Sequence, residues 1–423
     1  MSRVTIKQKN DQGLLDLLTK LLGCVAPGRK GVDGVNNIIS FDQYLMILDS
    51  LVSINGYEEL DPEKVRIIKA AIFRLATYKK QSIAYFKRAI EAQLRFIRRR
   101  SKREFYVVFP TLVNPASLSG AQHFCLGQNT IEVRNLAETR QRFEIDIAIR
   151  QSLVNMQIRT RSFLERRKGD ITYLILVRTA FDGEQALNDA QKVMDLFRGI
   201  VTFSLTRNTY HWQGGPPHPL AHVLPFPLYY VFDRTGGLQD YWVGWPLPTR
   251  HYIRSLSDRG LKDIKRFIGL FEQGIEDGNL TEKILDPMLR KYGLASGQQD
   301  RGLAFLYLWQ ILEVVALGGE GQLPDIKKKK RIRALLGNEL QRSVFECLYR
   351  RRNLLVHAGK FGVRLEDEIN ALKSLCDYSI SFLFYNLDKI NDLKDLEYYL
   401  ENIRLKEIEI NRKIRILREM LSV

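Results

Sequence analysis

The segment Arg350–Gly359 reads RRRNLLVHAG and holds three arginines, an asparagine and a histidine. Asn353 and His357 are four residues apart, so an α-helix places them on one face, where their side chains can touch. Arg352 and His357 are five residues apart, which separates them by roughly 140° around an ideal helix. One helix therefore presents both groups but does not bring them together. A long arginine could curl round the last turn, or a second copy of the helix could supply the missing partner.

The residues between these polar groups are apolar, since Leu354, Leu355 and Val356 precede the histidine. We therefore expect a partly buried helix with a histidine and arginines at its edge. Such a set suits phosphate chemistry, because histidine transfers protons near neutral pH and arginine binds phosphate through paired hydrogen bonds. The same segment also fits a basic helix end closed by a histidine, which the helix dipole favours. The spacing alone does not decide between these interpretations.

A second segment strengthens the case for phosphate chemistry. Residues Phe305–Leu317 read FLYLWQILEVVAL, an apolar helix with one acidic residue, Glu313. This helix, and Arg352-Asn353 followed by His357, resemble the HEPN superfamily (higher eukaryotes and prokaryotes nucleotide-binding), many of whose members are ribonucleases. The family signature is an arginine, often with a polar residue directly after it, and then a histidine. The segment RNLLVHAG is most similar to the Apea-like branch, which is known for defence against phage. The resemblance covers roughly residues 256–390.

Three arginines compete for the motif position. Arg352 leaves four residues before His357, Arg351 leaves five and Arg350 leaves six, and each spacing fits the signature. We assign the motif arginine to Arg352 because Asn353 follows it directly.

The resemblance implies a metal-independent endoribonuclease that uses the 2′-hydroxyl of RNA as its nucleophile. His357 would act as base or acid, and Arg352 would hold the scissile phosphate. Asn353 would orient His357 or bind the phosphate, and Glu313 would orient one of these groups or pair with an arginine. The family also implies products with a 2′,3′-cyclic phosphate and a 5′-hydroxyl, a homodimer that joins two motifs at one site, and a toxin-like or anti-phage role.

Two other functions remain open at this point. One is a HEPN-like domain that binds RNA or a nucleotide without cutting it, and the other is a structural scaffold whose charge is incidental. A binding protein would tolerate the loss of His357, whereas an enzyme would not.

The chain is strongly basic. Its 423 residues carry 65 Lys and Arg against 48 Asp and Glu, a formal net charge of +17. Such an excess indicates RNA, DNA or an anionic membrane surface as the partner, or simply a solvated basic surface. The densest basic run lies between the two helices that carry the resemblance, a position that fits RNA contact and plain solvation equally well. The predicted RNA-binding residues are Lys327, Lys328, Lys329, Lys330, Arg331, Arg333, Arg350 and Arg351.

No metal or other cofactor is expected. His211, His218 and His222 lie in or beside a loop at 213–227 whose five prolines prevent a helix that would align them. The four cysteines lack metal-ligand spacing, so reduced thiols are expected.

The sequence also predicts a cytoplasmic protein without membrane contact. The first residues, MSRVTIKQKNDQG, lack the apolar core of a signal peptide. The apolar stretches near 303–317 and 378–387 are interrupted by polar residues or are too short to span a bilayer.

We expect an α+β fold in four parts. Residues 1–103 form a helical N-terminal region, 104–255 an α+β middle domain, 256–390 an all-α HEPN-like helical bundle and 391–423 a terminal coiled-coil-like helix. Strands are expected at Phe105–Phe109, Ile145–Ile149, Ile171–Arg178, Tyr229–Phe232 and around Phe203 and Leu205, with a helix at Gln185–Phe197. Later helices are expected at Leu261–Ile275, Thr281–Tyr292, Gln298–Leu317, Lys330–His357 with a break at Gly337, and Leu365–Asp388.

The terminal segment carries a seven-residue apolar repeat, which Glu407 interrupts at one core position. The repeat runs through Leu393, Leu396, Leu400, Ile403, Ile410, Ile414, Leu417 and Leu421. Such a helix is suited to pairing with another copy of the chain or to packing against its own domain.

Overall fold

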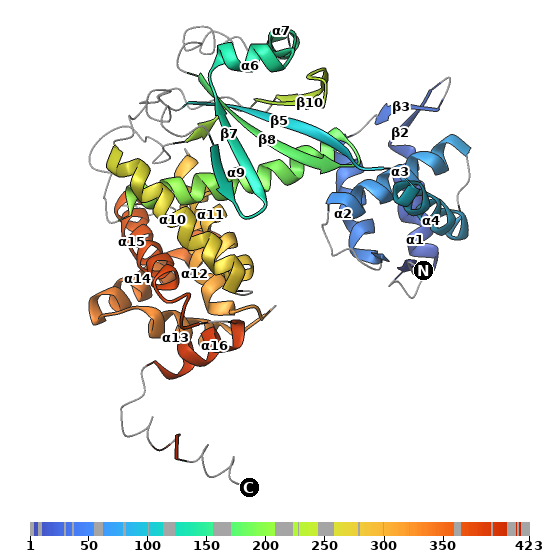
Figure 1. Ribbon diagram of the computed structural model, residues 1–423. Coiled ribbons are helices and arrows are strands. Elements are labelled where there is room, and N and C mark those ends of the chain that lie inside the picture. The colour runs from blue at the N-terminus through green and yellow to red at the C-terminus, as the bar shows by residue number, and fades with distance from the viewer. Residues whose placement is uncertain are drawn as a thin grey trace. The chain divides into compact units, whose positions relative to one another are not determined.

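The computed structural model contains two compact units (Figure 1). The first unit is Met1–Arg103 with Ala180–Gln185, and the second is Glu104–Thr179 with Ala186–Val423. The structure describes residues 4–6, 11–28, 31–35, 38–54, 62–78, 82–99, 101–112, 123–154, 171–207, 223–226, 228–243, 258–277, 280–298, 300–320, 322–358, 365–390, 392–403, 412 and 414–415.

The first unit is a small helical body. Its elements are β1 (Val4–Ile6), α1 (Asp11–Gly23), β2 (Val25–Gly28), β3 (Gly31–Val35), α2 (Ile38–Leu51), β4 (Val52–Ile54), α3 (Pro62–Tyr78) and α4 (Ile83–Arg99). Leu14, Leu18 and Leu21 are fully buried in it, as their helical spacing predicts. Lys64 and Asp49 form a buried ion pair at 3.1 Å, which joins α3 to α2.

The second unit is built on a seven-stranded sheet with the order β11-β10-β5-β8-β7-β6, and β9 pairs with β5. The strands are β5 (Arg103–Leu112), β6 (His123–Leu126), β7 (Asn129–Arg134), β8 (Ile171–Ala180), β9 (Leu224–Pro225), β10 (Leu228–Asp233) and β11 (Leu238–Val243). The first six residues of β8 are all buried, which agrees with their uninterrupted apolar sequence. The strands predicted at 105–109, 171–178 and 229–232 are thereby confirmed, and the chain is α+β.

Two strand predictions are wrong. Ile145–Ile149 belongs to a helix, α7 (Ile145–Val154), which follows α6 (Leu136–Arg142). Ile145, Ala148 and Ser152 of α7 are buried at helical spacing, and a five-residue window is too short to separate this period from strand alternation. Phe203 lies in helix α9 (Gly183–Thr206), where its ring packs on Phe267 at 5.2 Å between centroids.

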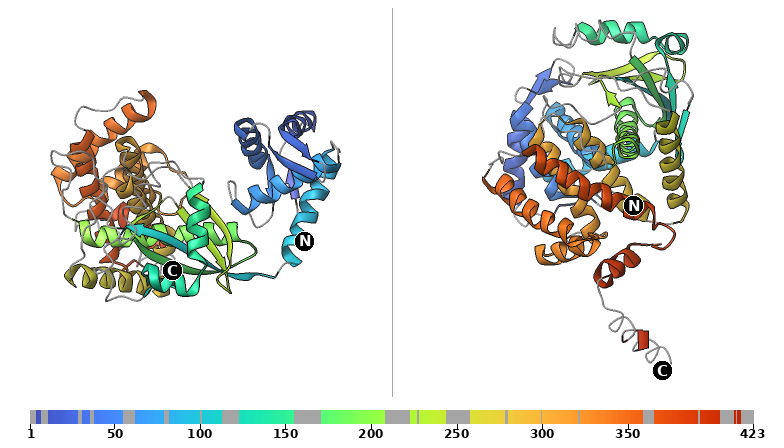
Figure 2. Two further views of the ribbon diagram at one scale, coloured as in Figure 1. Left: turned by 90° about the horizontal axis from the view of Figure 1, so that it is seen from above. Right: turned by 90° about the vertical axis from the view of Figure 1, so that its left-hand side faces the viewer.

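Helix α9 joins the sheet to the C-terminal helices (Figures 1 and 2). Toward the sheet, its Phe197 ring lies 5.0 Å from that of Phe124 on β6. Toward α11 (Asp286–Gly297) it presents Gly199, where an added Cβ would lie 1.9 Å from the carbonyl oxygen of Leu289. The two helices therefore cross in backbone contact, which only glycine permits. The division of this unit into two domains at residue 255 stays a prediction.

A buried polar network ties the end of α9 to two later helices. Tyr292 Oη on α11 donates to Asp377 at 2.6 Å, and Lys373 Nζ donates to the other oxygen of the same carboxylate at 2.7 Å. Lys373 also donates to the carbonyl of Thr206 at 2.8 Å, so it closes the last turn of α9. Lys373 and Asp377 lie on α15 (Leu365–Phe384), and the network therefore fixes α9, α11 and α15 together.

The remaining C-terminal helices follow the predicted order. They are α10 (Asp258–Asp277), a π-helical turn η2 (Thr281–Leu285), α12 (Arg301–Leu317), α13 (Asp325–Leu335), α14 (Glu339–Ala358) and α16 (Leu393–Asn402). The predicted break at Gly337 is confirmed, and Asn338 caps α14 by accepting from the backbone N–H of Gln341 at 2.8 Å. Within the described part of the chain, none of the helices has both the length and the apolar character needed to cross a bilayer.

The glycine crossing of α9 and α11 gives a prediction with an internal control. Gly199→Ala is expected to lower the free energy of unfolding by about 2–3 kcal/mol, since the added methyl group forces the helices apart. Gly269→Ala on α10, where a Cβ would meet nothing within 4 Å, should instead raise it by up to about 1 kcal/mol through helix propensity. Urea unfolding of both variants tests this, and equal effects would refute the crossing.

Candidate active site

Three of the four predicted catalytic residues meet where α14 packs on α12. Arg352 Nη2 lies 3.4 Å from Glu313 Oε1, and Arg352 Nη1 donates to Asn353 Oδ1 at 3.2 Å. Trp309 Nε1 donates to the same oxygen of Glu313 at 2.9 Å. The side chains of Arg352 and Glu313 are 26% and 27% exposed, so the pair is reachable from solvent but held by packing. Of the two roles predicted for Glu313, pairing with an arginine is the one observed.

A second layer connects this cluster to α13. Tyr349 Oη donates to Asp325 Oδ2 at 3.0 Å, and the Lys329 ammonium lies 4.0 Å from the centroid of the Tyr349 ring. Burial, and then the bond to Asp325, raises the pKa of Tyr349, so the phenol stays protonated at neutral pH. The bond from Tyr349 correspondingly lowers the pKa of Asp325. Helices α12, α13 and α14 therefore converge on one polar cluster.

His357 lies in the last turn of α14, and its side chain is outside the described residues. Its position in the helix is four residues after Asn353, which gives the two residues a common face.

The three consecutive arginines face different surroundings. Arg352 turns toward Glu313 on α12, and Arg351 Nε lies 2.9 Å from Glu368 on α15. Arg350 is exposed and lines a cavity on the other side of α14. No carboxylate among the described residues pairs with the Arg350 side chain.

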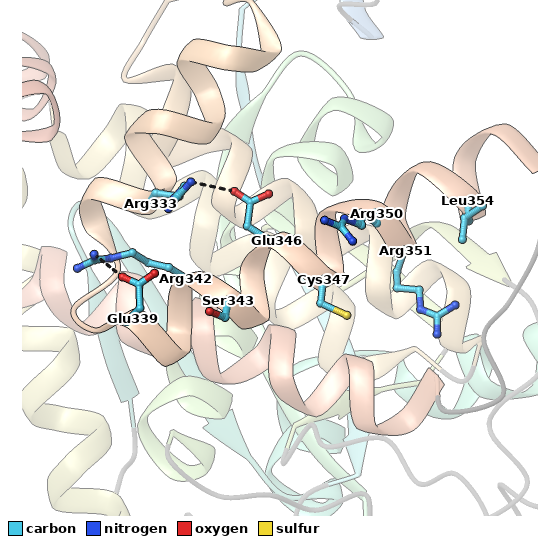
Figure 3. Close-up of a pocket in the computed structure, with 9 residues that line it drawn as sticks. All are labelled: Arg333, Glu339, Arg342, Ser343, Glu346, Cys347, Arg350, Arg351 and Leu354. Atoms are coloured by element: carbon cyan, nitrogen blue, oxygen red, sulfur yellow. Dashed lines mark hydrogen bonds and ion pairs between the residues drawn. The ribbon is translucent and has the colours of Figure 1, made fainter.

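That cavity has a volume of about 560 Å³ and lies along the exposed face of α14 (Figure 3). Its lining residues are Arg333 from α13 and Glu339, Arg342, Ser343, Glu346, Cys347, Arg350, Arg351 and Leu354 from α14. Two ion pairs join lining residues, Arg333 with Glu346 at 3.4 Å and Arg342 with Glu339 of the same helix at 2.9 Å. Sequence analysis missed Arg342, Ser343 and Cys347. Their signal was the spacing of Ser343, Cys347, Arg350 and Leu354 by three and four residues along one helix face.

A second cavity of about 670 Å³ adjoins the first. It is lined by Ile326, Lys329, Lys330, Arg333, Ala334, Arg342, Glu346, Leu400 and Glu401. Arg333, Arg342 and Glu346 line both cavities, so they form the common wall.

The predicted RNA-binding role of Arg331 is wrong. Its side chain is only 1% exposed, and its guanidinium contacts Glu320 at 3.0 Å, Glu401 at 2.9 Å and Glu397. It also donates to the carbonyl of Ala316 at 3.1 Å, at the end of α12. Arg331 therefore clamps α16 and the end of α12 onto α13, and no face of it is open to a phosphate. Two of its three carboxylate partners, Glu397 and Glu401, come from a distant part of the sequence.

The neighbouring lysines have mixed surroundings. Lys327 joins the carboxylates around Arg331, at 3.4 Å from Glu401, and Lys328 lies 3.5 Å from Asp325. Lys329 pairs with Glu346 at 3.2 Å, while Lys330 is exposed at the second cavity. Only part of the basic run thus faces a cavity.

The start of the heptad-like tail packs on its own unit. Leu396 and Leu400 of α16 are buried, and α16 contacts α13. Of the two predicted roles for the tail, packing against its own domain applies to this first part. Most of the later repeat positions lie outside the described residues, and pairing through them stays a prediction.

Metal ligands do not gather anywhere in the described part of the chain, where no group of three or more His, Cys, Asp or Glu could hold an ion. His211, His218 and His222 lie outside the described residues. Cys24 and Cys376 are buried, whereas Cys125 and Cys347 are exposed thiols.

The clamp around Arg331 predicts a pH-dependent stability. Arg331→Met should cost roughly 2–3 kcal/mol at pH 7, below the range for fully buried pairs because the carboxylates are a third or more exposed. The hydrogen bond from Arg331 lowers the pKa of Glu401, so this contribution is complete above the unfolded pKa of about 4.3. It is lost as the pH falls through the lowered folded pKa. Urea unfolding of both proteins from pH 7 to pH 3 measures the difference, and a constant difference would contradict the clamp.

Comparison of the chain with protein-family models, with curated proteins and with solved structures found no match.

Proposed function

We propose that the protein is a metal-independent endoribonuclease whose active site lies on α14. The observation that carries the proposal is the contact between Arg352, Asn353 and Glu313, one turn before His357 in the same helix. RNA contains its own nucleophile, the 2′-hydroxyl, so the protein has to supply only a base and cations. These residue types are sufficient for that chemistry.

Each residue has a distinct part in the proposed reaction. His357 takes the proton of the 2′-hydroxyl or returns one to the leaving 5′-oxygen, because an imidazole side chain exchanges protons near neutral pH. Arg352 binds the scissile phosphate and stabilises the charge that grows on it. Asn353 orients His357 or binds the phosphate, and Glu313 acts as a positioning residue through Arg352. The guanidinium has five N–H donors, so the contacts with Glu313 and Asn353 leave donors for a phosphate.

The alternative is a protein that binds RNA or a nucleotide without cutting it. The arginine-lined cavity beside Arg350 favours this second function independently, because a binding site needs positive charge but no general base. The two functions differ in their dependence on His357. The role in anti-phage defence or as a toxin rests on the resemblance to the HEPN family, and a cytoplasmic location fits both an RNA substrate and the exposed thiols of Cys125 and Cys347.

We also propose that the enzyme works as a homodimer. Arg352 and position 357 lie on different sides of α14, whereas Leu354 between them is 46% exposed. A two-fold axis at Leu354 would pair two antiparallel α14 helices. Residues that lie equally far before and after Leu354 would then face each other across the axis. The cleft would then be lined by residues 350–357 of both chains, with two copies of position 357 and several arginines around it.

The catalytic proposal predicts cleavage that does not need a metal. Purified protein should cut single-stranded RNA in excess EDTA, and His357→Ala should lower the rate by roughly 100- to 10,000-fold. Arg352→Ala should have a loss of similar size, while His123→Ala, at an exposed histidine on β6, should retain full activity. Activity abolished by chelator and restored by magnesium or manganese would reject this mechanism.

The dimer proposal is tested by two substitutions on one helix face. Leu354→Asp should produce monomers and remove cleavage, because it buries charge at the proposed axis. Leu340→Asp is the matched control, since Leu340 is 74% exposed on the same face of α14 but lies far from that axis. Light scattering after gel filtration, together with RNA cleavage, reports both properties. A fully active monomeric wild-type protein would contradict the composite site.

A further inference from the structure

The two cavities beside α14 form one continuous basic surface. The first begins at Leu354 and Arg350, at the proposed active-site end of the helix, and extends to Glu339. The second continues from the shared wall of Arg333 and Arg342 to Lys330 and Leu400. Together they connect the end of α14 with the groove between α13 and α16.

The charge of this surface favours an anion. Six basic side chains line the two cavities, namely Lys329, Lys330, Arg333, Arg342, Arg350 and Arg351, against three acidic ones, Glu339, Glu346 and Glu401. Arg333 and Arg342 each pair with one carboxylate within the cavity, Glu346 and Glu339. Neither Arg350 nor Lys330 has a carboxylate partner among the described residues, so their charges are the least compensated in the two cavities.

The apolar lining selects the kind of anion. Ile326 at the edge of the second cavity is 84% exposed, and Ala334 and Leu400 line the same cavity. A free phosphate or sulfate makes no contact with apolar side chains. A single-stranded nucleic acid, in contrast, places its phosphates on cations and its unpaired bases on apolar side chains. A duplex hides its bases and would not enter a recess of this size.

We propose that these cavities form a track for the single-stranded RNA next to the cleaved bond, with Arg350 as the main phosphate contact. The inference rests on the proposed function for the direction of the strand, but the binding itself does not depend on cleavage. Arg350 and position 357 are seven residues apart, which puts them about 20° apart on one face of α14. A strand with its scissile phosphate at the end of α14 therefore reaches Arg350 with a neighbouring phosphate.

The test measures binding without cleavage. A fluorescent 2′-O-methyl oligoribonucleotide lacks the nucleophile, and its anisotropy gives the association constant at increasing KCl. Each phosphate contact in a single strand contributes about 0.7 to the slope of log K against log salt. Arg350→Ala should reduce the magnitude of this slope by about 0.7, and Arg342→Ala with Arg350→Ala by about 1.4. Arg350→Lys should restore the wild-type slope.

The matched control is Arg259→Ala, which removes the same charge from an exposed site on α10 outside both cavities. An unchanged slope in Arg350→Ala, or an equal loss in Arg259→Ala, would overturn the track. Equally tight binding of a blunt RNA duplex would overturn the assignment to single strands. If the slope falls as expected but the wild-type protein never cuts RNA, the track holds and the ribonuclease proposal fails. If RNA is cut but the slope does not change, only the track fails.

Discussion

The rotation of α14 about its own axis decides which of its side chains can act together. Phe345 and Leu348 are buried in the helical core and fix that rotation. With the helix held this way, Arg352 turns toward Glu313 on α12, while Arg350 turns to the cavity on the opposite side. Because successive residues lie about 100° apart, a shift by one residue would exchange these surroundings. The proposed chemistry and the proposed RNA track both follow from this single constraint.

The packing around α14 gives the site a rigid support. Trp309 on α12 stacks on Phe345 with 5.7 Å between ring centroids, and it also donates to the Glu313 carboxylate that pairs with Arg352. The buried network of Tyr292, Lys373 and Asp377 fixes the helices against which α12 packs. Removing one member of such a network leaves a buried charge or donor without a partner, which is costly. A cationic site can therefore be kept in one geometry although its charges repel each other.

Much of the helical order could be predicted from the sequence, because long apolar periods and glycine breaks are local signals. The break at Gly337 and the interior strand at Ile171–Ala180 are of this kind. The strand prediction for Ile145–Ile149 was wrong because five residues fit both the helical and the strand period. The strand prediction for Phe203 was wrong because a helix buried on most sides has no polar face to reveal its period. For the site, the pairing of Glu313 with an arginine could be anticipated. The burial of Arg331 could not, since Glu397 and Glu401 lie more than sixty residues later in the chain.

The proposed reaction depends on attack by the 2′-hydroxyl at a phosphate held on α14, and the ends of the RNA products test this most directly. Mass spectrometry of a cut oligonucleotide should show a 2′,3′-cyclic phosphate on one fragment and a 5′-hydroxyl on the other. The same oligonucleotide with a single 2′-deoxynucleotide at the cut position should remain intact. Fragments with a 5′-phosphate and a 3′-hydroxyl, or cleavage at the deoxynucleotide, would mean that water is the nucleophile and would contradict the mechanism.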